Sequence, residues 1–174
     1  MLDLGVGPGT SAVEMARAAP GRRFVGLDRA FEMLPRARRR AARAGVVLPL
    51  LRADALALPF RAASFDGAAG HSVLYLLPDA ARALAELRRV LRPGGRLALL
   101  EPRATRGDLL AAGRDGLRFG ASMALWRVMS GLHGRYAEAA LERLLAEAGF
   151  VEVSARPVLR GFGVVATGAA PPAG

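Results

Sequence analysis

The sequence contains no cysteine and no lysine. The absence of cysteine excludes disulfide scaffolds, thiolate metal sites, iron–sulfur clusters and cysteine nucleophiles. The absence of lysine excludes a P-loop, whose motif ends in Gly-Lys-[Ser/Thr]. Long apolar runs are also missing: although 52% of the residues are hydrophobic, no run approaches the roughly 18 residues that cross a bilayer. The amino terminus lacks the basic segment followed by an apolar segment that marks a secretory signal, so we expect a cytoplasmic protein. The length of the chain predicts about one domain.

Every one of the 25 basic residues is arginine, and the net charge is +10. A basic excess indicates a nucleic-acid partner in some proteins, but a chain rich in Ala, Arg, Gly and Leu is also typical of a strongly biased genome. The densest run of arginines, residues 36–43, lies in a predicted helix, where consecutive side chains spread around the axis. Two interpretations stay open for it, a solvated helix face and an anion-attracting surface.

Strand-like and helix-like segments alternate along the chain. Strands are expected at 1–4, 23–27, 47–52, 64–70, 97–100, 151–153 and 162–166. Helices are expected at 11–18, with a capping box from Ser11 to Glu14, at 31–44, around Leu84–Leu91 and around Leu141–Ala148. This alternation predicts an α/β fold with a mostly parallel sheet, whose ligands bind beyond the carboxyl ends of the strands. We expect one domain over residues 1–168 and a disordered tail over 169–174.

A glycine-rich turn, Gly5-Val6-Gly7-Pro8-Gly9-Thr10, follows the first strand-like segment. A dinucleotide fingerprint, G-x-G-x-x-G/A, would place its last small residue at position 10. That position is threonine, and the third glycine comes one residue early. Pro8 also removes a backbone donor from the loop, which is unfavourable for holding a pyrophosphate. The turn is therefore not a typical site for a nicotinamide dinucleotide.

Acidic residues stand at the ends of the first three predicted strands. Asp3 precedes the glycines, where it suits a cationic group, while the backbone N–H groups of the turn favour a carboxylate. Asp28 is placed to accept hydrogen bonds from both hydroxyls of a ribose, and Asp54 to accept one from an adenine amino group. An amino acid joined to an adenosine is S-adenosylmethionine, so we expect this cofactor.

The sequence resembles the class I S-adenosylmethionine-dependent methyltransferases, in particular the small-molecule enzymes that act on quinone precursors, lipids and natural products. The motifs that carry the resemblance follow in the family's order: Asp3-Leu4-Gly5-Val6-Gly7-Pro8-Gly9-Thr10, Gly26-Leu27-Asp28, Ala53-Asp54-Ala55 with Leu58-Pro59-Phe60, Ser64-Phe65-Asp66 and Leu91-Arg92-Pro93-Gly94-Gly95. The resemblance implies a Rossmann-like sheet of seven strands with helices on both faces and an antiparallel last strand. Members usually carry tens of residues before the glycine motif, so it also implies a chain truncated at the amino terminus.

The resemblance further implies a set of cofactor-binding residues. It places Gly5, Gly7 and Gly9 beside the methionine part, Asp28 at the ribose, and Asp54 with Ala55 at the adenine. The complete predicted set is Asp3, Gly5, Gly7, Gly9, Thr10, Asp28, Arg29, Met33, Asp54, Ala55 and His71. Two members have structural alternatives: Thr10 as a helix-capping residue and Met33 as part of a helix core.

Methyl transfer from this cofactor mainly requires that the acceptor be positioned, with a general base only where the acceptor must lose a proton. His71 is the candidate for a base or a substrate-orienting group, with cofactor lining as its alternative, and Tyr75 is a second candidate. Glu101 either meets substrate or ends its strand. No group of His and carboxylates has the spacing of metal ligands, so we expect no metal.

The segment 102–135 is expected to be an insertion that covers the substrate. It contains Trp126 and His133 and is rich in Leu, Ala, Met and Gly, which favours a small apolar or amphiphilic acceptor. The alternatives are a degenerate cofactor-binding module without catalysis and an RNA methyltransferase. The second is disfavoured because Asp66-Gly67-Ala68-Ala69-Gly70-His71 stands where base-methylating families carry an Asn/Asp-Pro-Pro-aromatic motif. We therefore expect a small-molecule acceptor and no nucleic-acid partner.

Overall fold

A computed structural model describes residues 1–105 and 107–173 of the chain. The strands form one seven-stranded sheet in the order β3-β2-β1-β4-β5-β7-β6. Strands β1 to β5 pair in parallel, and β7 runs antiparallel to both of its neighbours, β5 and β6. The strands are β1 (Leu2–Leu4), β2 (Val25–Asp28), β3 (Leu50–Arg52), β4 (Phe65–His71), β5 (Leu91–Pro102), β6 (Val151–Val158) and β7 (Gly163–Ala169). The predicted α/β fold with an antiparallel last strand is confirmed.

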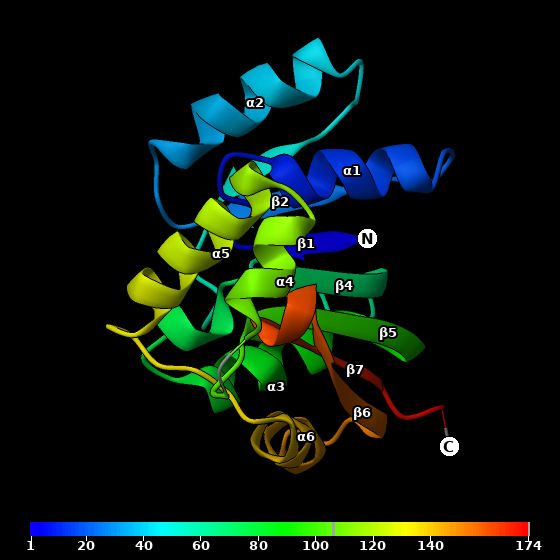
Figure 1. Ribbon diagram of the computed structural model, residues 1–174. Coiled ribbons are helices and arrows are strands. Elements are labelled where there is room, and N and C mark those ends of the chain that lie inside the picture. The colour runs from blue at the N-terminus through cyan, green and yellow to red at the C-terminus, as the bar shows by residue number, and fades with distance from the viewer. Residues whose placement is uncertain (106, 174) are drawn as a thin grey trace.

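Helices cover both faces of the sheet. The α-helices are α1 (Thr10–Ala18), α2 (Met33–Arg43), α3 (Ala80–Val90), α4 (Leu109–Arg114), α5 (Leu117–Ser130) and α6 (Glu138–Glu147), and the short 3-10 helices are η1 (Leu74–Leu76) and η2 (Leu159–Gly161). Figure 1 shows α1 and α2 on one side of the sheet and α3 and α6 on the other. Helices α4 and α5 follow the carboxyl end of β5 and pack against each other. Among the described residues, no helix is long and apolar enough to cross a membrane.

The first helix begins differently from the expected capping box. Its N-cap is Gly9, which has a φ of 82° and no side-chain cap. Because the turn through Pro8 starts the helix at Thr10, Ser11 lies inside it, and its hydroxyl donates to Asp3 Oδ2 at 3.1 Å. The prediction of a capping box from Ser11 to Glu14 was therefore wrong, and so was Thr10 as the cap, although the predicted end of the helix at Ala18 is confirmed.

Strand β4 forms although glycine and alanine are poor strand formers. Its glycines lie where neighbouring side chains approach the backbone closely. A Cβ on Gly67 would lie 2.7 Å from Met1 Sδ, and one on Gly70 would lie 2.9 Å from Leu99 Cδ2. Burial against these neighbours, and not local propensity, therefore determines this strand.

The carboxyl-terminal end of the sheet extends beyond the predicted domain limit. Strand β7 includes Ala169, and Ala170 is buried. The Ala170 N–H donates to the Gly95 carbonyl, and the Gly94 N–H donates to the Ala170 carbonyl. The prediction of a disordered tail was wrong for these two alanines, because the turn through Gly94 and Gly95 offers them backbone partners. Gly174 lies outside the described residues.

Candidate functional site

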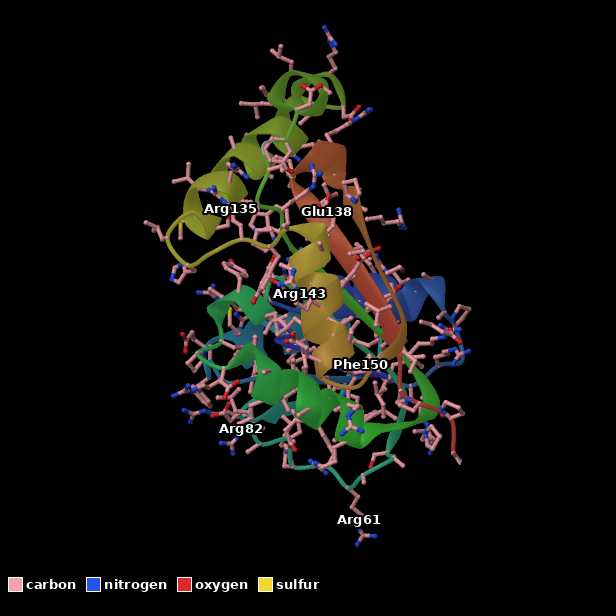
Figure 2. The ribbon with its side chains drawn as sticks, turned by 90° about the horizontal axis from the view of Figure 1, so that it is seen from below. Arg61, Arg82, Arg135, Glu138, Arg143 and Phe150 are labelled. Atoms are coloured by element: carbon pink, nitrogen blue, oxygen red, sulfur yellow. The ribbon has the colours of Figure 1, made fainter. Side chains whose placement is uncertain are left out.

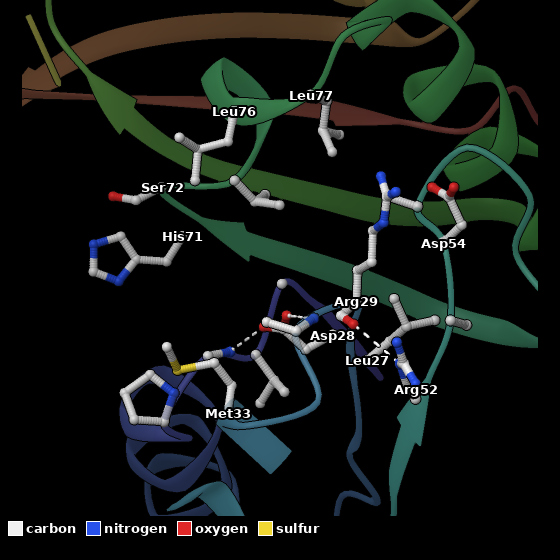
Figure 3. Close-up of a pocket in the computed structure, with 18 of the residues that line it drawn as sticks. Leu27, Asp28, Arg29, Met33, Arg52, Asp54, His71, Ser72, Leu76 and Leu77 are labelled. Atoms are coloured by element: carbon white, nitrogen blue, oxygen red, sulfur yellow. Dashed lines mark hydrogen bonds between the residues drawn. The ribbon is translucent and has the colours of Figure 1, made fainter. Parts of the chain in front are cut away.

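A cleft of about 950 Å³ opens at the carboxyl ends of β1 to β4. It is lined by most of the predicted cofactor residues, namely Gly5, Gly7, Thr10, Asp28, Arg29, Met33, Asp54, Ala55 and His71. In the view of Figure 3, His71 and Met33 lie at one end of the pocket, Asp54 lies at the other, and Asp28 lies between them. Asp3, Gly9 and Tyr75 are not among the described residues that line the cleft. The structure therefore brings three sequence motifs and the end of β4 together around one cavity.

The glycine turn is held between β1 and the end of β2. Its Val6 N–H donates to the Leu27 carbonyl at 2.9 Å. Gly5 has a φ of +65°, and a Cβ there would lie 2.6 Å from Val73 Cγ2, so only glycine fits this position. Gly7 also has positive φ, but a Cβ there would make only an ordinary contact, 3.9 Å from the Gly5 carbonyl oxygen. The turn thus exposes its backbone to the cleft, as a ligand that approaches closely requires.

Gly9 has a different role from the other two glycines. It lies at the start of α1 with a φ of +82°, and a Cβ on it would lie 2.9 Å from the Cα of Ala37 in α2. This glycine lets the two helices pack closely, which is the role that the last small residue has in a dinucleotide fingerprint. Its predicted contact with the cofactor stays a prediction without support from the cleft lining.

The carboxylate of Asp28 holds two backbone segments that border the cleft, the glycine turn and the loop after β2. Its Oδ2 accepts a hydrogen bond from the Gly7 N–H at 2.7 Å, and its Oδ1 accepts one from the Ala30 N–H at 2.9 Å. A carboxylate has about four acceptor sites, so each oxygen keeps one for a ligand hydroxyl. Asp54, at the other end, accepts from the Leu56 N–H at 2.9 Å. Both carboxylates are therefore positioned by their own loops.

Asp3 is buried directly before the glycine turn, with 1% of its surface exposed. One carboxylate oxygen accepts from Ser11, whereas the other, Oδ1, has no hydrogen-bond partner among the described residues. Burial raises the pKa of Asp3 to about 7; the hydrogen bond from Ser11 opposes this shift, and the charge of Asp28 adds to it. An unpaired buried acceptor is costly, and a nearby cation or donor would offset that cost.

His71 and Ser72 form the rim of the cleft at the end of β4 (Figure 3). Desolvation lowers the pKa of His71, which favours the neutral ring that a general base requires. Ser72 has a φ of 56°, and its hydroxyl is buried without a partner among the described residues. Strained backbone conformations of this kind concentrate at functional sites. Sequence reasoning did not select Ser72, because positive φ at a serine leaves no signal in the sequence.

Helix α5 reaches the rim through an aromatic contact. The rings of His71 and Trp126 of α5 lie 6.2 Å apart between centroids, nearly at right angles. Tyr75, the second catalytic candidate, instead packs against His133, also at 6.2 Å. Burial, with a smaller contribution from the charge of Glu101, raises the pKa of Tyr75. The structure therefore places His71, but not Tyr75, beside the cleft.

Glu101 has a role that neither sequence interpretation foresaw. This fully buried residue accepts backbone hydrogen bonds from Val73, Leu74 and Tyr75, at 3.2, 2.8 and 3.4 Å. Burial raises the pKa of Glu101 to about 7, although these hydrogen bonds oppose the shift. The carboxylate thus holds the turn into η1, from which Val73 and Leu76 line the cleft. In the part of the chain that the structure describes, no three His or carboxylate side chains are grouped so as to hold a metal ion.

Comparison with known proteins agrees with this geometry. A family model described as "Methyltransferase domain" matches residues 2–99, more than half of the chain. A demethylmenaquinone methyltransferase of Thermus thermophilus is 46% identical over 101 residues, which cover 58% of this chain and 46% of that protein. A trans-aconitate 2-methyltransferase of an Azoarcus species is 41% identical over 103 residues, which cover 59% of this chain and 39% of that protein.

Solved structures share the fold along nearly the whole chain. The S-adenosylmethionine-dependent methyltransferase SibL, in its apo form, superposes with a TM-score of 0.74 and 27% identity over 98% of this chain and 50% of that one. The chain matches less than half the length of the two curated relatives. From the family match and this fold, we conclude that the chain belongs to the methyltransferase domain family, within the class I S-adenosylmethionine-dependent methyltransferases.

Proposed function

We propose that this chain binds S-adenosylmethionine in the cleft and transfers its methyl group to a small, apolar acceptor. The observation that carries the proposal is the glycine turn locked to Asp28: the Gly7 N–H donates to a carboxylate that still has free acceptor sites facing the cleft. This arrangement combines exposed backbone with an acceptor for hydroxyl groups. A ligand with an amino-acid end and a ribose requires both.

The parts of this cofactor, from its amino-acid end through the ribose to the adenine, would lie against cleft residues that follow one another along the chain. Gly5 and Gly7 would border the amino-acid end, with the unpaired Oδ1 of Asp3 behind them as an acceptor for a cationic group. Asp28 would accept from the ribose hydroxyls. At the far end, Asp54 and its neighbour Ala55 would hold the adenine, with Met33 and Arg29 also lining the cavity. These assignments are proposals that rest on the lining and its donors and acceptors.

When bound, S-adenosylmethionine supplies a methyl group that its sulfonium already activates. The chain must then hold the acceptor close and exclude water. His71 is placed to take a proton from an acceptor hydroxyl or carbon acid, because its ring is kept neutral at the rim. Ser72 adds a hydroxyl without an internal partner beside it. The chain thus needs to position the acceptor beside the methyl group, with His71 as the base and Ser72 as one polar contact.

The lining supports an apolar acceptor. Besides the cofactor residues, the cleft is bordered by Phe31, Leu76, Leu77 and Pro78, which add carbon surface to its lining. The two relatives are named for different acceptors, a quinone precursor and a small acid. The apolar side chains favour an acceptor of the first kind, because burying carbon surface stabilises the complex by about 25 cal/mol per Å².

The proposal is tested first by calorimetric titration of S-adenosylhomocysteine into the whole chain. We expect micromolar binding, no binding of NAD, and an affinity about tenfold lower for Asp28→Asn, because one charge-assisted acceptor is lost. Glu147→Gln makes the same charge change on an exposed position of α6, on the other side of the sheet, and should bind like the parent. A folded chain that binds no S-adenosylhomocysteine would contradict the proposal.

A second step separates binding from catalysis. The chain is incubated with S-adenosylmethionine and apolar phenol or quinol acceptors, and methylated products are followed by mass spectrometry. Product that His71→Ala reduces, with unchanged cofactor affinity, would support the role of His71. Binding without turnover on any acceptor would instead favour a cofactor-binding module without catalysis.

A further inference from the structure

The two helices that follow β5 carry an unusual concentration of exposed apolar side chains. Between residues 109 and 132 the exposed large hydrophobic residues are Leu109, Leu110, Leu117, Leu125, Val128, Met129 and Leu132. Leu117 is 86% exposed and Val128 is 66% exposed. Monomeric soluble proteins seldom expose contiguous apolar patches of this kind without a binding role. We call this set the α4–α5 face.

The spacing places three of these residues along one side of α5. Leu117, Ala121, Leu125 and Val128 follow one another at intervals of four, four and three residues, so they form a single stripe. The opposite side of the helix, with Gly120 and Met123, is buried against the body of the protein. A helix of 14 residues is about 21 Å long. The stripe is therefore an extended apolar ridge and not an isolated side chain.

Charges around this ridge are basic and uncompensated. Arg114 and Arg118 are both exposed, and neither forms an ion pair among the described residues. The one acidic residue of the two helices and their connection, Asp115, is occupied by a bidentate hydrogen bond from Arg160, at 2.6 and 2.7 Å. An apolar surface rimmed by arginine is complementary to a surface that offers both hydrocarbon and negative charge.

The position of the face connects it to the cleft. Trp126 lies on the same helix and contacts His71, which lines the cleft. In Figure 1, α4 and α5 lie next to each other, in agreement with the contacts between them. Trp126 lies nine residues after Leu117 and so on the opposite side of α5 from the stripe. Helix α5 therefore meets the rim of the cleft with one side and exposes the apolar stripe on the other.

We propose that the α4–α5 face docks this protein on an anionic lipid surface, with Leu117, Leu125 and Val128 in the boundary between headgroups and acyl chains. Arg114 and Arg118 then lie at the level of the lipid phosphates. Apolar side chains that dock on a bilayer in this way lie about 5–10 Å deep in the boundary, and the helix that carries them does not cross the membrane.

A second copy of the chain is the other occupant that an apolar face suggests. The charge of the protein disfavours it, because each copy carries a net charge of +10 and the rim of the face is basic. Two such faces would bring arginines together without acidic partners. Negatively charged lipid instead neutralises them, with a gain of about fivefold in affinity for each arginine near the surface.

The test is co-sedimentation of the whole chain with vesicles, without cofactor or acceptor, so that its result is independent of methyl transfer. We expect binding to vesicles that contain phosphatidylglycerol and at least tenfold weaker binding to pure phosphatidylcholine. Val128→Ser should weaken binding to the anionic vesicles about fivefold, because one apolar contact is removed. Val47→Ser, at a valine that is 88% exposed outside this face, should leave it unchanged.

The charge contribution has its own matched pair. Arg118→Ser should lower the affinity about fivefold, whereas Arg61→Ser should change it little, because Arg61 projects from the far end of the molecule from α4 and α5 (Figure 2). Equal effects of the two valine changes, equal binding to neutral and anionic vesicles, or no binding would each overturn the proposal. A dimer in sedimentation velocity that Val128→Ser dissolves would assign the face to a second copy and overturn it as well.

Discussion

The glycine-turn half of the molecule and helices α4 and α5, which form the proposed substrate cover, differ in how their sequence relates to their structure. Around the turn, single atoms decide which residue fits: a Cβ on Gly5 would meet Val73 Cγ2 at 2.6 Å. In the cover, Gly113 and Gly116 have no heavy atom within 4 Å of an added Cβ. The glycine turn needs particular residues because of its positive φ and the close approach of Val73, whereas in α4 and α5 a close approach occurs only where the helices meet, at Gly120, where a Cβ would lie 3.1 Å from Gly113 Cα. Motifs are therefore readable in the first region and absent from the second.

The two regions meet at few contacts. Glu101, before the cover, supports the turn into η1, and Trp126 of the cover touches His71 at the rim. We therefore expect substitutions at these contacts or in the glycine turn to change stability and binding strongly, and substitutions within α4 and α5 to change them little.

The largest loss of stability is expected for Glu101→Ala, which removes the support of the turn into η1. Three buried backbone N–H groups lose their acceptor, and we expect a loss of about 4 kcal/mol in the free energy of unfolding, since each unsatisfied group costs about 1–3 kcal/mol. Denaturant unfolding measures it. Glu101→Gln retains one acceptor oxygen and should recover part of the loss. Equal destabilisation by both variants would contradict the hydrogen-bonding role.

Gly5→Ala should destabilise the protein by about 3 kcal/mol and abolish binding of S-adenosylhomocysteine, because positive φ and a clash with Val73 combine. Gly21→Ala is the matched control: its φ is +90°, but nothing lies within 4 Å. Gly21→Ala should lower the free energy of unfolding by about 1 kcal/mol, the cost of positive φ alone, and leave the binding of S-adenosylhomocysteine unchanged. Similar losses for the two variants would show that backbone strain, and not the close approach, makes Gly5 necessary.

Asp3→Asn should change how stability depends on pH. The folded protein holds the Asp3 proton up to about pH 7, whereas the unfolded chain loses it near pH 3.9, so the parent loses stability as the pH rises through this window. The variant lacks this loss, so its melting temperature relative to the parent should rise between about pH 4 and about pH 7 and change little above that. The raised pKa of Glu101 acts in the same direction in both proteins and cancels in the comparison. A flat difference across this range would argue against a buried, protonated Asp3.

The smallest effect is expected inside the cover, and with the opposite sign. Gly113→Ala, in α4, should stabilise the protein by about 0.5 kcal/mol, because alanine has the higher helix propensity and its Cβ meets no other atom. Thermal melting should detect the gain, and binding of S-adenosylhomocysteine should not change. A loss of stability would mean that the cover is packed as tightly as the glycine turn.

The order of elements, the parallel sheet and most of the cleft lining were predictable, because hydrophobic periodicity and the acidic residues at strand ends are local signals. Ser72, the support from Glu101 and the strand pairing of Ala169 were not. Each depends on a partner far away in sequence: Ser72 donates its N–H to Leu100, and Ala169 pairs with Arg96 and Val151. The start of α1 was missed for a local reason, since the turn before Gly9 displaced Ser11 from the cap.

By itself the sequence determined the fold class and the residues that meet at the carboxyl ends of β1 to β3. Glycines with positive φ and carboxylates after apolar runs have few alternative uses, because steric exclusion and hydrogen bonding act over one or two residues. Only the tertiary structure decided that Asp3 and Glu101 are buried with raised pKa values, that His71 and not Tyr75 lies beside the cleft, and that α5 leaves one apolar side open. The burial and the contacts of these residues depend on elements that are distant in the chain, and only the packing of the folded protein brings those elements together.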